Sequence, residues 1–178
     1  MCDAIDFSLK RSGYSARRLT QKDADVLQRL YEQCKAFFLL TDGLAPLPTA
    51  AHDEFDDLPA GKETEDIFIF GLFDADDVLL GMISAVRHCP DPQTWWIGLM
   101  MLVPERRGQG LGADFYTAFR RWVAAQGASR ISLSAIAPNK PGLKFWKSMG
   151  FEVTRKIPSR QFKAKTHLVY VLSHATGI

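Results

Sequence analysis

Apolar residues recur along this chain at two spacings, and each spacing predicts a different kind of element. Between residues 26 and 38 they return every three or four positions, which is typical of a helix with one buried face. The residues of this face are Val26, Leu27, Leu30, Tyr31, Cys34, Phe37 and Phe38. Thr20, with Asp23 three positions later, resembles a capping box that would begin the helix. A glycine and two prolines predict a loop over residues 41–48, and a second, short helix is expected over residues 49–58.

Runs of β-branched and aromatic residues between turn signals predict about seven strands. They cover residues 14–19, 67–73, 78–86, 95–103, 130–135, 151–157 and 166–172. The run over residues 95–103 is almost wholly apolar, so we expect it to be buried on both faces.

A second helical stripe follows residue 110, and it consists of Leu111, Phe115, Ala118, Phe119 and Trp122. Gly127 would end this helix, and a further short helix is expected over residues 139–149. Because a helix separates strands 95–103 and 130–135, we expect these two to be parallel. The last two strands read as antiparallel, joined by a basic loop over residues 158–165.

Length and composition favour a single soluble domain. The chain has 178 residues, of which 47% are hydrophobic and 24% charged. We expect residues 1–178 to form one domain, with residues 1–13 as a loosely held lead. The first residues lack the features of a signal peptide, and no apolar run is long enough to span a membrane, which favours the cytoplasm. Three cysteines and four histidines have no metal-ligand spacing, so no metal site is expected.

Charge is divided unequally along the chain. Residues 1–100 hold 9 basic and 17 acidic residues, whereas residues 101–178 hold 13 basic and 3 acidic ones. Opposite fields of this kind suit an anionic ligand on one side and a cationic ligand on the other, although drift of surface composition would give the same counts. His52, Asp53, Glu54, Asp56 and Asp57 gather in the short helix, and they are candidates for a face that binds a cationic substrate.

The segment from Val103 to Gly112 reads as an anion cradle. Its three alternating glycines let successive backbone N–H groups turn into one concavity at the positive end of the following helix. Arg106 and Arg107 add guanidinium groups suited to phosphate. The alternative is a connection between strand and helix whose glycines only permit tight packing. The expected strand before it and helix after it favour the anion site.

The order of these elements, together with two motifs, resembles the GNAT superfamily of acyl-CoA-dependent N-acetyltransferases. The first motif is Arg107-Gly-Gln-Gly-Leu-Gly112, which is similar to the family's pyrophosphate loop R/Q-x-x-G-x-G/A. The second is Asn139 to Phe151, which is similar to N-x-x-A-x-x-F-Y-x-x-x-G-F. The resemblance implies an α/β (α+β) fold: a central mixed, mostly antiparallel sheet of about seven strands, with a splayed parallel pair and helices on both faces.

By this resemblance, acetyl-CoA as cosubstrate would enter the cleft between the splayed strands. Its pantetheine would pair with backbone groups of the opened strand, its pyrophosphate would bind the cradle, and Asn139 would lie near the thioester. The residues implied in cofactor binding are Met101, Leu102, Val103, Arg106, Arg107, Gly108, Gln109, Gly110, Leu111, Gly112, Asn139 and Trp146. The acceptor would be a small cationic amine or a peptide amino group, which attacks the thioester directly in a ternary complex.

The chain departs from the family pattern where protons are transferred. Trp146 stands where many members have a tyrosine that acts as the general acid, and an indole N–H cannot deliver a proton near neutral pH. The strand over residues 95–103 also lacks the glutamate that some members use as base. Tyr170 is our candidate acid, and Glu54 and Asp56 are our candidate bases through a water, with Asp91 as a further option. Trp95, Trp96 and the run 37–40 fit either an acceptor pocket or the core.

Two other functions stay open at this point. One is an acyl-CoA-binding sensor without catalysis, which the missing tyrosine and glutamate suggest. The other, less favoured, is an RNA-binding module that uses the basic residues of the last two strands. These residues are Arg155, Lys156, Arg160, Lys163 and Lys165. Neither function is expected to involve a membrane or a metal ion. A homodimer is equally open.

Overall fold

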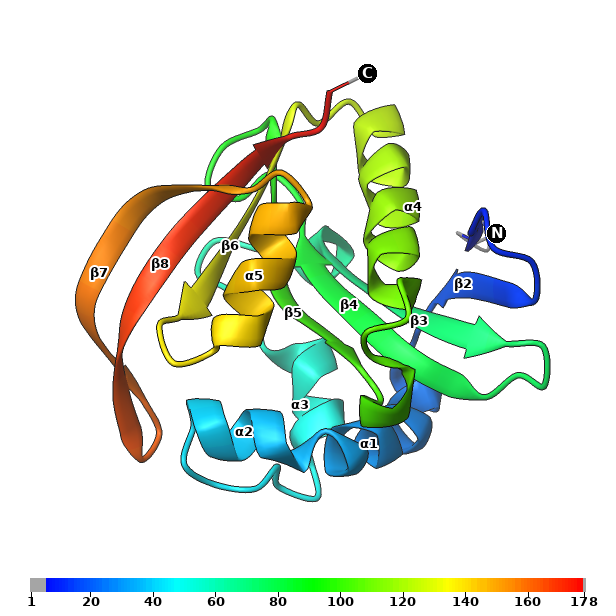
Figure 1. Ribbon diagram of the computed structural model, residues 1–178, viewed down its shortest axis with the longest axis horizontal. Coiled ribbons are helices and arrows are strands. Elements are labelled where there is room, and N and C mark those ends of the chain that lie inside the picture. The colour runs from blue at the N-terminus through cyan, green and yellow to red at the C-terminus, as the bar shows by residue number, and fades with distance from the viewer. Residues whose placement is uncertain (1–5, 178) are drawn as a thin grey trace.

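One mixed sheet runs through the middle of the molecule (Figure 1). The computed structural model describes residues 6–177, and these contain eight strands in the order β1-β2-β3-β4-β5-β6-β8-β7. The strands are β1 (Asp6–Ser8), β2 (Tyr14–Arg18), β3 (Ile67–Asp74), β4 (Leu79–Val86), β5 (Thr94–Leu102), β6 (Arg130–Ile136), β7 (Glu152–Phe162) and β8 (Lys165–Ala175). Only β5 and β6 are parallel among these described strands, as the sequence predicts; every other neighbouring pair is antiparallel.

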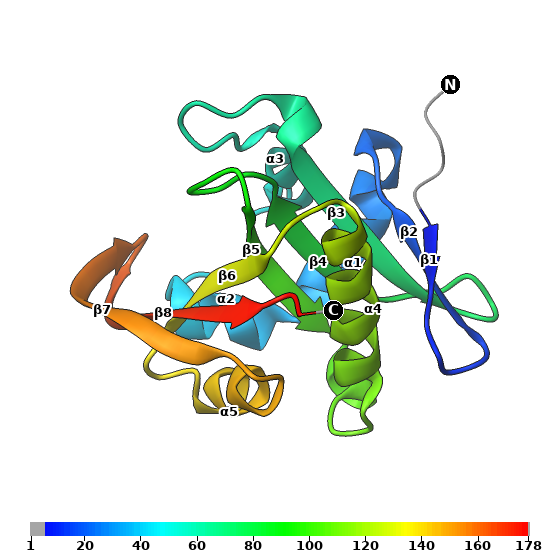
Figure 2. The ribbon, with the colours of Figure 1, turned by 90° about the horizontal axis from the view of Figure 1, so that it is seen from above.

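Helices cover both faces of this sheet, which also confirms the prediction. They are α1 (Ala24–Gln33), α2 (Lys35–Thr41), α3 (Ala50–Asp56), α4 (Leu111–Ala125) and α5 (Lys140–Ser148). Single 3-10 turns occupy Gln21–Asp23, Thr64–Asp66 and Pro104–Arg106. Figure 2 places α4 and α5 on one side of the sheet and α3 on the other. The capping box of Thr20 and Asp23 forms as expected, at the 3-10 turn before α1.

An aromatic cluster fixes α4 to the sheet. Phe70 of β3 and Trp122 of α4 approach to 4.9 Å between ring centroids, and Phe119 is fully buried beside them. The helical stripe predicted for α4 is therefore the stripe that faces the core. Large aromatic side chains contribute much of the apolar area removed from water, so this cluster holds the helix that follows the glycine segment.

The first helical region differs from its prediction. The expected continuous helix divides at Cys34, whose φ of −92° and ψ of 18° leave the helical range, so α2 is a separate helix of seven residues. The Cys34 thiol donates to the carbonyl of Leu102 at 3.4 Å, which ties the break to the end of β5. Part of the expected loose lead also forms strand β1, which pairs with β2. Residues 1–5, with Cys2, lie outside the described residues.

Two strand predictions need correction. The second half of β5 is not buried on both faces: Gly98 is exposed, and Leu99 and Met100 are half-buried, because β6 has moved away from them. The basic loop expected over residues 158–165 belongs mostly to strands, since β7 and β8 form one long hairpin that turns at Lys163. Bulges in β7 and its position at the sheet edge let Pro158 stay within the strand.

Truncating the buried ring that joins α4 to the sheet should destabilise the whole protein. We expect Phe119→Ala to lower the free energy of unfolding by about 3 to 5 kcal/mol, because it removes a large buried side chain and leaves a cavity. Urea unfolding followed by circular dichroism measures this change. Val78→Ala, at a half-exposed turn position, is the control and should change stability by less than about 0.5 kcal/mol. Equal effects of the two substitutions would contradict the proposed role of the aromatic cluster.

Candidate active site

The parallel strands β5 and β6 pair over only four residues. Pairing runs from Thr94 with Arg130 to Ile97 with Leu133, and β5 then continues to Leu102 without β6. The separation coincides with a bulge against β4, where Ser84 pairs with Leu99 but Ala85 pairs with Ile97. Gly98 is the extra residue, and such a bulge bends the strand that carries it. The bend therefore opens an edge of β5 inside the sheet.

The register on β4 decides which backbone groups face this opening. The amide of Val103 donates to the carbonyl of Leu80, so this residue already pairs with β4. Hydrogen bonding alternates along an antiparallel strand, so the backbone of Met101 also points to β4, and the groups of Met100 and Leu102 point into the gap. Met101 and Val103 therefore turn their backbone groups toward β4, and the Leu102 carbonyl accepts from the Cys34 thiol and the Arg107 guanidinium. The predicted pairing of a pantetheine arm near these three residues stays a prediction.

The glycine segment follows β5 directly and begins α4. Gly108 and Gly110 have φ of 73° and 81°, a left-handed conformation that favours glycine. From Gly108 to Ala113, no backbone N–H donates a hydrogen bond to any described part of the chain. A side chain added at Gly108 would meet nothing within 4 Å, so there is room beside these donors. The segment has the form of an anion cradle at a helix N-terminus.

Two arginines frame the cradle, one of which the sequence analysis missed. Arg11 comes from the turn between β1 and β2, where it pairs with Asp114 at 2.8 Å and donates to the carbonyl of Gln109 at 3.2 Å. Arg107 does not point into the cradle as a free phosphate ligand. Its guanidinium turns back to the carbonyl of Leu102 at 2.9 Å and to the Cys34 sulfur at 3.5 Å. Burial raises the pKa of the Cys34 thiol, and Arg107 opposes this effect.

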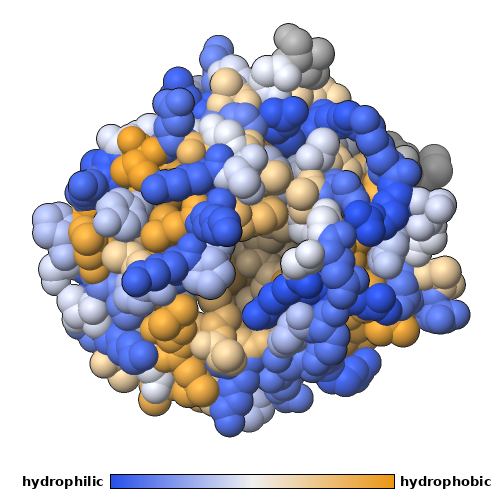
Figure 3. All heavy atoms as spheres, viewed as in Figure 1, coloured by the Kyte–Doolittle hydropathy of each residue, from blue (hydrophilic) through white to orange (hydrophobic). Residues whose placement is uncertain are grey.

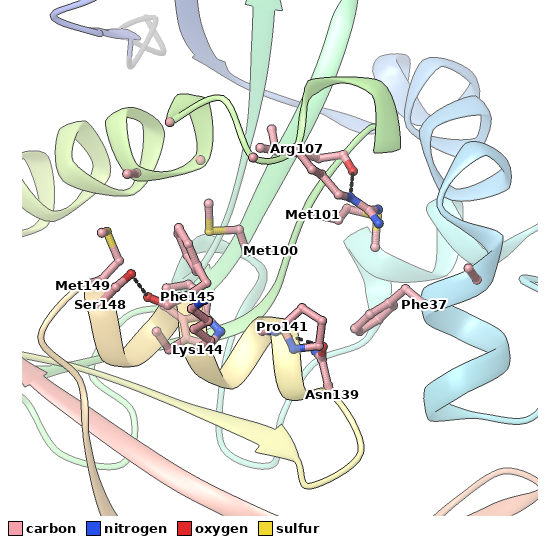
Figure 4. A pocket seen from close by; sticks show the side chains of 18 of the residues that line it. Phe37, Met100, Met101, Arg107, Asn139, Pro141, Lys144, Phe145, Ser148 and Met149 are labelled. Atoms are coloured by element: carbon pink, nitrogen blue, oxygen red, sulfur yellow. Dashed lines mark hydrogen bonds between the residues drawn. The ribbon is translucent and has the colours of Figure 1, made fainter.

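One cavity of about 710 Å³ extends from the cradle along α5 to α2. Figure 3 shows it as a hollow near the middle of one face, with a weakly apolar interior and a hydrophilic rim. In Figure 4, Met100 and Met101 lie on β5, and Phe37 of α2 faces the N-terminal end of α5. The ionisable residues among its described lining are Arg107 and Lys144, both basic. The cavity therefore suits a ligand with an apolar arm and an anionic end.

Eight of the predicted cofactor residues line this cavity. They are Met101, Leu102, Arg107, Gly108, Gly110, Gly112, Asn139 and Trp146. Val103, Arg106, Gln109 and Leu111 are not among the described lining residues. A stripe on α5 also lines the cavity and is not among the predicted cofactor residues; it consists of Pro141, Lys144, Phe145 and Ser148. Their spacing of three and four positions is a helical face, so it could have been recognised.

Asn139 and Trp146 are held by contacts within this region. The Asn139 side chain accepts from the amide of Gly142 at 3.1 Å and so caps α5. Trp146 is only 8% exposed and packs edge-on against Tyr116 at 5.5 Å and near Phe151 at 5.1 Å. In this chain the residue at the tyrosine position is thus mainly part of the core.

Glu54 lies at the other side of the opened strand. Its Oε2 accepts a hydrogen bond from the Tyr31 hydroxyl at 3.0 Å, and the side chain of Ser84 bonds to the same carboxylate. Ser84 is the β4 residue opposite the bulge, so α3 brings this carboxylate to the point where β5 and β6 separate. Burial raises the pKa of Glu54, and the two hydroxyls offset part of this effect. An enclosed carboxyl group held by hydroxyls in this way is a candidate functional group.

Like Glu54, the other candidate catalytic residues are not among the described lining residues of the cavity. Tyr170 is on β8, beneath the ammonium group of Lys156 at 5.8 Å, and Asp56 accepts from Gln21 on the exposed side of α3. Asp91 caps the turn before β5 through Thr94. Asp53 and Asp57 are also exposed, and no carboxylate is among the described lining residues. The acidic face expected to bind a cationic substrate is thus outside the cavity, and Glu54 alone of these acids reaches the separated strands.

The sequence matches the Acetyltransferase (GNAT) family over residues 27–151, which includes the opened strand, the cradle and α5. This match covers more than half of the chain. The chain belongs to the GNAT family of acetyltransferases. No curated protein sequence matches this GNAT acetyltransferase. The family uses acetyl-CoA, and the cradle with its free donors fits the pyrophosphate of that cosubstrate.

Solved structures share the fold of this GNAT acetyltransferase. An acetyltransferase from Thermus thermophilus has a TM-score of 0.71 at 20% identity, over 91% of this chain and 96% of that one. The ribosomal-protein-S5-alanine acetyltransferase from Vibrio fischeri has a TM-score of 0.73 at 17% identity, over 95% and 96%. Spermidine N-acetyltransferase from Vibrio cholerae, in complex with CoA and spermine, has a TM-score of 0.73 at 13% identity, over 93% and 97%. These identities establish the fold alone.

Two further observations concern ligands and membranes. Among residues 6–177, no three side chains of the kind that ligate metals come together. None of the helices in the same range is long and apolar enough to cross a membrane.

The enclosure of Glu54 predicts a pH-dependent change in stability. With a raised pKa in the folded state, the unfolded chain loses this proton first, so folding stability falls as pH rises through the folded-state pKa. Glu54→Gln has no proton to lose and keeps partners for both hydroxyls. Its free energy of unfolding relative to wild type should therefore be higher at pH 8 than at pH 5. Urea unfolding at both pH values measures the free energy of unfolding of the variant and of wild type. A difference between the two proteins that does not vary with pH would contradict the enclosure of Glu54.

Proposed function

We propose that this chain transfers an acetyl group from acetyl-CoA to a primary amine, either a small amine or an amino-terminal group. The observation that carries the proposal is the opened edge of β5, which leads directly into a cradle of unpaired backbone donors. An extended pantetheine arm fits such an edge, because peptide-like amides bind to unpaired strand groups. The basic lining of the cavity favours the same cosubstrate.

In this proposal, the pyrophosphate binds the amides between Gly108 and Ala113 at the positive end of α4. Arg11 and Lys144 add positive charge near the two sides of the cavity. The backbone donors of Met100 and Leu102 face the pantetheine arm. Binding therefore depends mainly on backbone geometry, which suits a chain whose Arg107 is engaged with Leu102.

Glu54 is the proposed general base. It takes a proton from the acceptor ammonium, directly or through one water, and the free amine then attacks the thioester carbonyl. The new C–N bond forms, the C–S bond breaks, and the thiolate leaves with its electron pair. The nitrogen then loses its excess proton to this thiolate or to water, which gives the neutral amide and the CoA thiol. A backbone N–H of the opened strand stabilises the oxyanion. A thiolate needs no obligatory acid to leave, since thiol pKa values lie near about 8.5, which agrees with Trp146 at the tyrosine position.

The acceptor is proposed to carry a single reacting amine rather than several cationic groups. Glu54, which lies near the separation of β5 and β6, is the one carboxylate proposed to meet the amine, whereas the other acids of α3 are exposed. A polyamine with its charges buried would need several paired carboxylates. An acyl-CoA-binding sensor is the alternative, which the tryptophan at position 146 favours.

Turnover with a defined set of acceptors tests the proposed activity. We expect acetyl-CoA-dependent thiol release with at least one of spermidine, an alanine-terminated peptide and benzylamine. Gly110→Trp should weaken CoA binding by about 10- to 100-fold, since it displaces the anion from charged hydrogen bonds, as measured by calorimetry. Gly127→Trp is the matched control: it has a similar φ of 86°, and open space surrounds it. CoA binding without turnover of any acceptor would instead support the sensor.

Removing the proposed base should reduce the chemical step. We expect Glu54→Gln to lower kcat by about 10²- to 10⁴-fold, with little change in CoA affinity. The wild-type rate should rise with pH through the raised pKa of Glu54, and the variant should lose this dependence. Asp53→Asn, on the exposed side of the same helix, is the control and should keep kcat within about twofold. A pH profile that is the same in Glu54→Gln and wild type would contradict this role.

A further inference from the structure

The tip of the β7–β8 hairpin binds the C-terminal end of α2, more than 120 residues away in the sequence. The Lys165 ammonium donates to the carbonyls of Leu39 at 2.9 Å and Leu40 at 3.4 Å. The amide of Ala164 donates to the carbonyl of Asp42 at 3.0 Å, and Lys163 pairs with the Asp42 carboxylate at 2.9 Å. His167 Nε2 lies 2.8 Å from the carbonyl of Thr41. We call this set of contacts the latch.

The latch satisfies groups that a helix cannot satisfy by itself. The last four carbonyls of any helix lack partners within it, and the negative end of the helix attracts cations. In α2 the carbonyl of Phe38 accepts from the amide of Asp42, and the next three carbonyls are the ones that meet the latch. With only seven residues, α2 is too short to be stable without such tertiary support.

One face of α2, between this end and its N-terminus, borders the cavity. Ala36, Phe37 and Leu40 line it, and Phe37 points toward the N-terminal end of α5 (Figure 4). The cradle belongs to α4 at the other end of the same cavity. None of the hairpin residues of the latch is a described lining residue. The hairpin tip can therefore act on the cavity through α2, without touching its ligand.

We propose that the latch sets the position of the α2 wall and thereby the fit of the acceptor amine. Lys163, Lys165 and His167 are then positioning residues, which hold Phe37 and Leu40 at the distance that the acceptor requires. This inference rests on the proposed acetyl transfer, and it assigns to the basic hairpin a role that does not involve nucleic acid. The positive charges of the tip are used at the negative end of a helix and at Asp42.

The double variant Lys163→Met, Lys165→Met tests the latch in two independent ways. Hydrogen exchange should become faster at the amides of residues 35–42 and remain unchanged in α4, because α2 loses its support while the rest of the fold persists. KM should rise about tenfold for each turned-over acceptor among spermidine, the alanine-terminated peptide and benzylamine. The dissociation constant of acetyl-CoA should stay within about twofold, since the cradle is at the other end of the cavity.

Two control variants separate positioning from charge and from folding. Lys165→Arg, made in the wild-type protein, keeps a cationic donor for the Leu39 and Leu40 carbonyls, so its acceptor KM should equal that of wild type. Arg155→Gln removes a positive charge from the same hairpin outside the latch, so it should leave both exchange and KM unchanged. A rise in acceptor KM for Arg155→Gln equal to that of the double variant would overturn the proposal in favour of a general charge effect.

The outcomes also distinguish the latch from the proposed function. Unchanged exchange in residues 35–42 of the double variant would overturn the latch, whatever the kinetics. Faster exchange with an unchanged acceptor KM would overturn its role in positioning. If the wild-type protein turns over none of the three acceptors, the proposed function fails and the role in acceptor fit fails with it, whereas the exchange result still decides whether the hairpin supports α2.

Discussion

The short pairing of β5 with β6 is the constraint on which the rest of the site depends. A sheet gains hydrogen bonds from every paired residue, so two parallel strands that separate after four pairs leave backbone groups without partners. The bulge at Gly98 makes this separation compatible with a continuous pairing of β5 and β4. The aromatic cluster beneath α4 holds β5 through Trp95 where this strand still pairs with β6. The opening is therefore a stable part of the fold, and a ligand can complete the hydrogen bonds that the sheet leaves unmade.

Opposite electrostatic conditions meet at this opening. On the side of α4, backbone N–H groups and basic side chains favour a dianionic group. Leaving these donors without a protein partner costs little free energy, because solvent reaches them. On the side of α3, a carboxylate is enclosed with two hydroxyl partners, and burial disfavours its charged form. Such a group reduces the stability of the folded protein near neutral pH. The proposed role of Glu54 as a base would give that loss a functional reason, because a carboxyl with a raised pKa is a better proton acceptor than an ordinary one.

Local patterns predicted much of the fold and one end of the site. The stripe from Leu111 to Trp122 and the glycines before it required only short-range information, and both lie where expected. The break at Cys34 and the long hairpin could not be predicted, because each depends on partners distant in sequence: the Leu102 carbonyl in one case and the end of α2 in the other. The same limit applies to Glu54. Its acidic neighbours look alike in sequence, and only the packing of α3 against α1, where Tyr31 meets Glu54, separates one enclosed carboxylate from several exposed ones.

Arg11 joins the first strands to the anion cradle, and this connection has a thermodynamic consequence. Its guanidinium contacts the carbonyl of Gln109 and the carboxylate of Asp114, and it lies beside Gly110. An anion in the cradle would add a favourable charge next to this guanidinium, and so would stabilise the turn between β1 and β2. Linkage is reciprocal, so the order of that turn must raise the affinity for the anion by the same free energy. The edge of the sheet, remote from the reacting amine, is thus part of the equilibrium that fills the site.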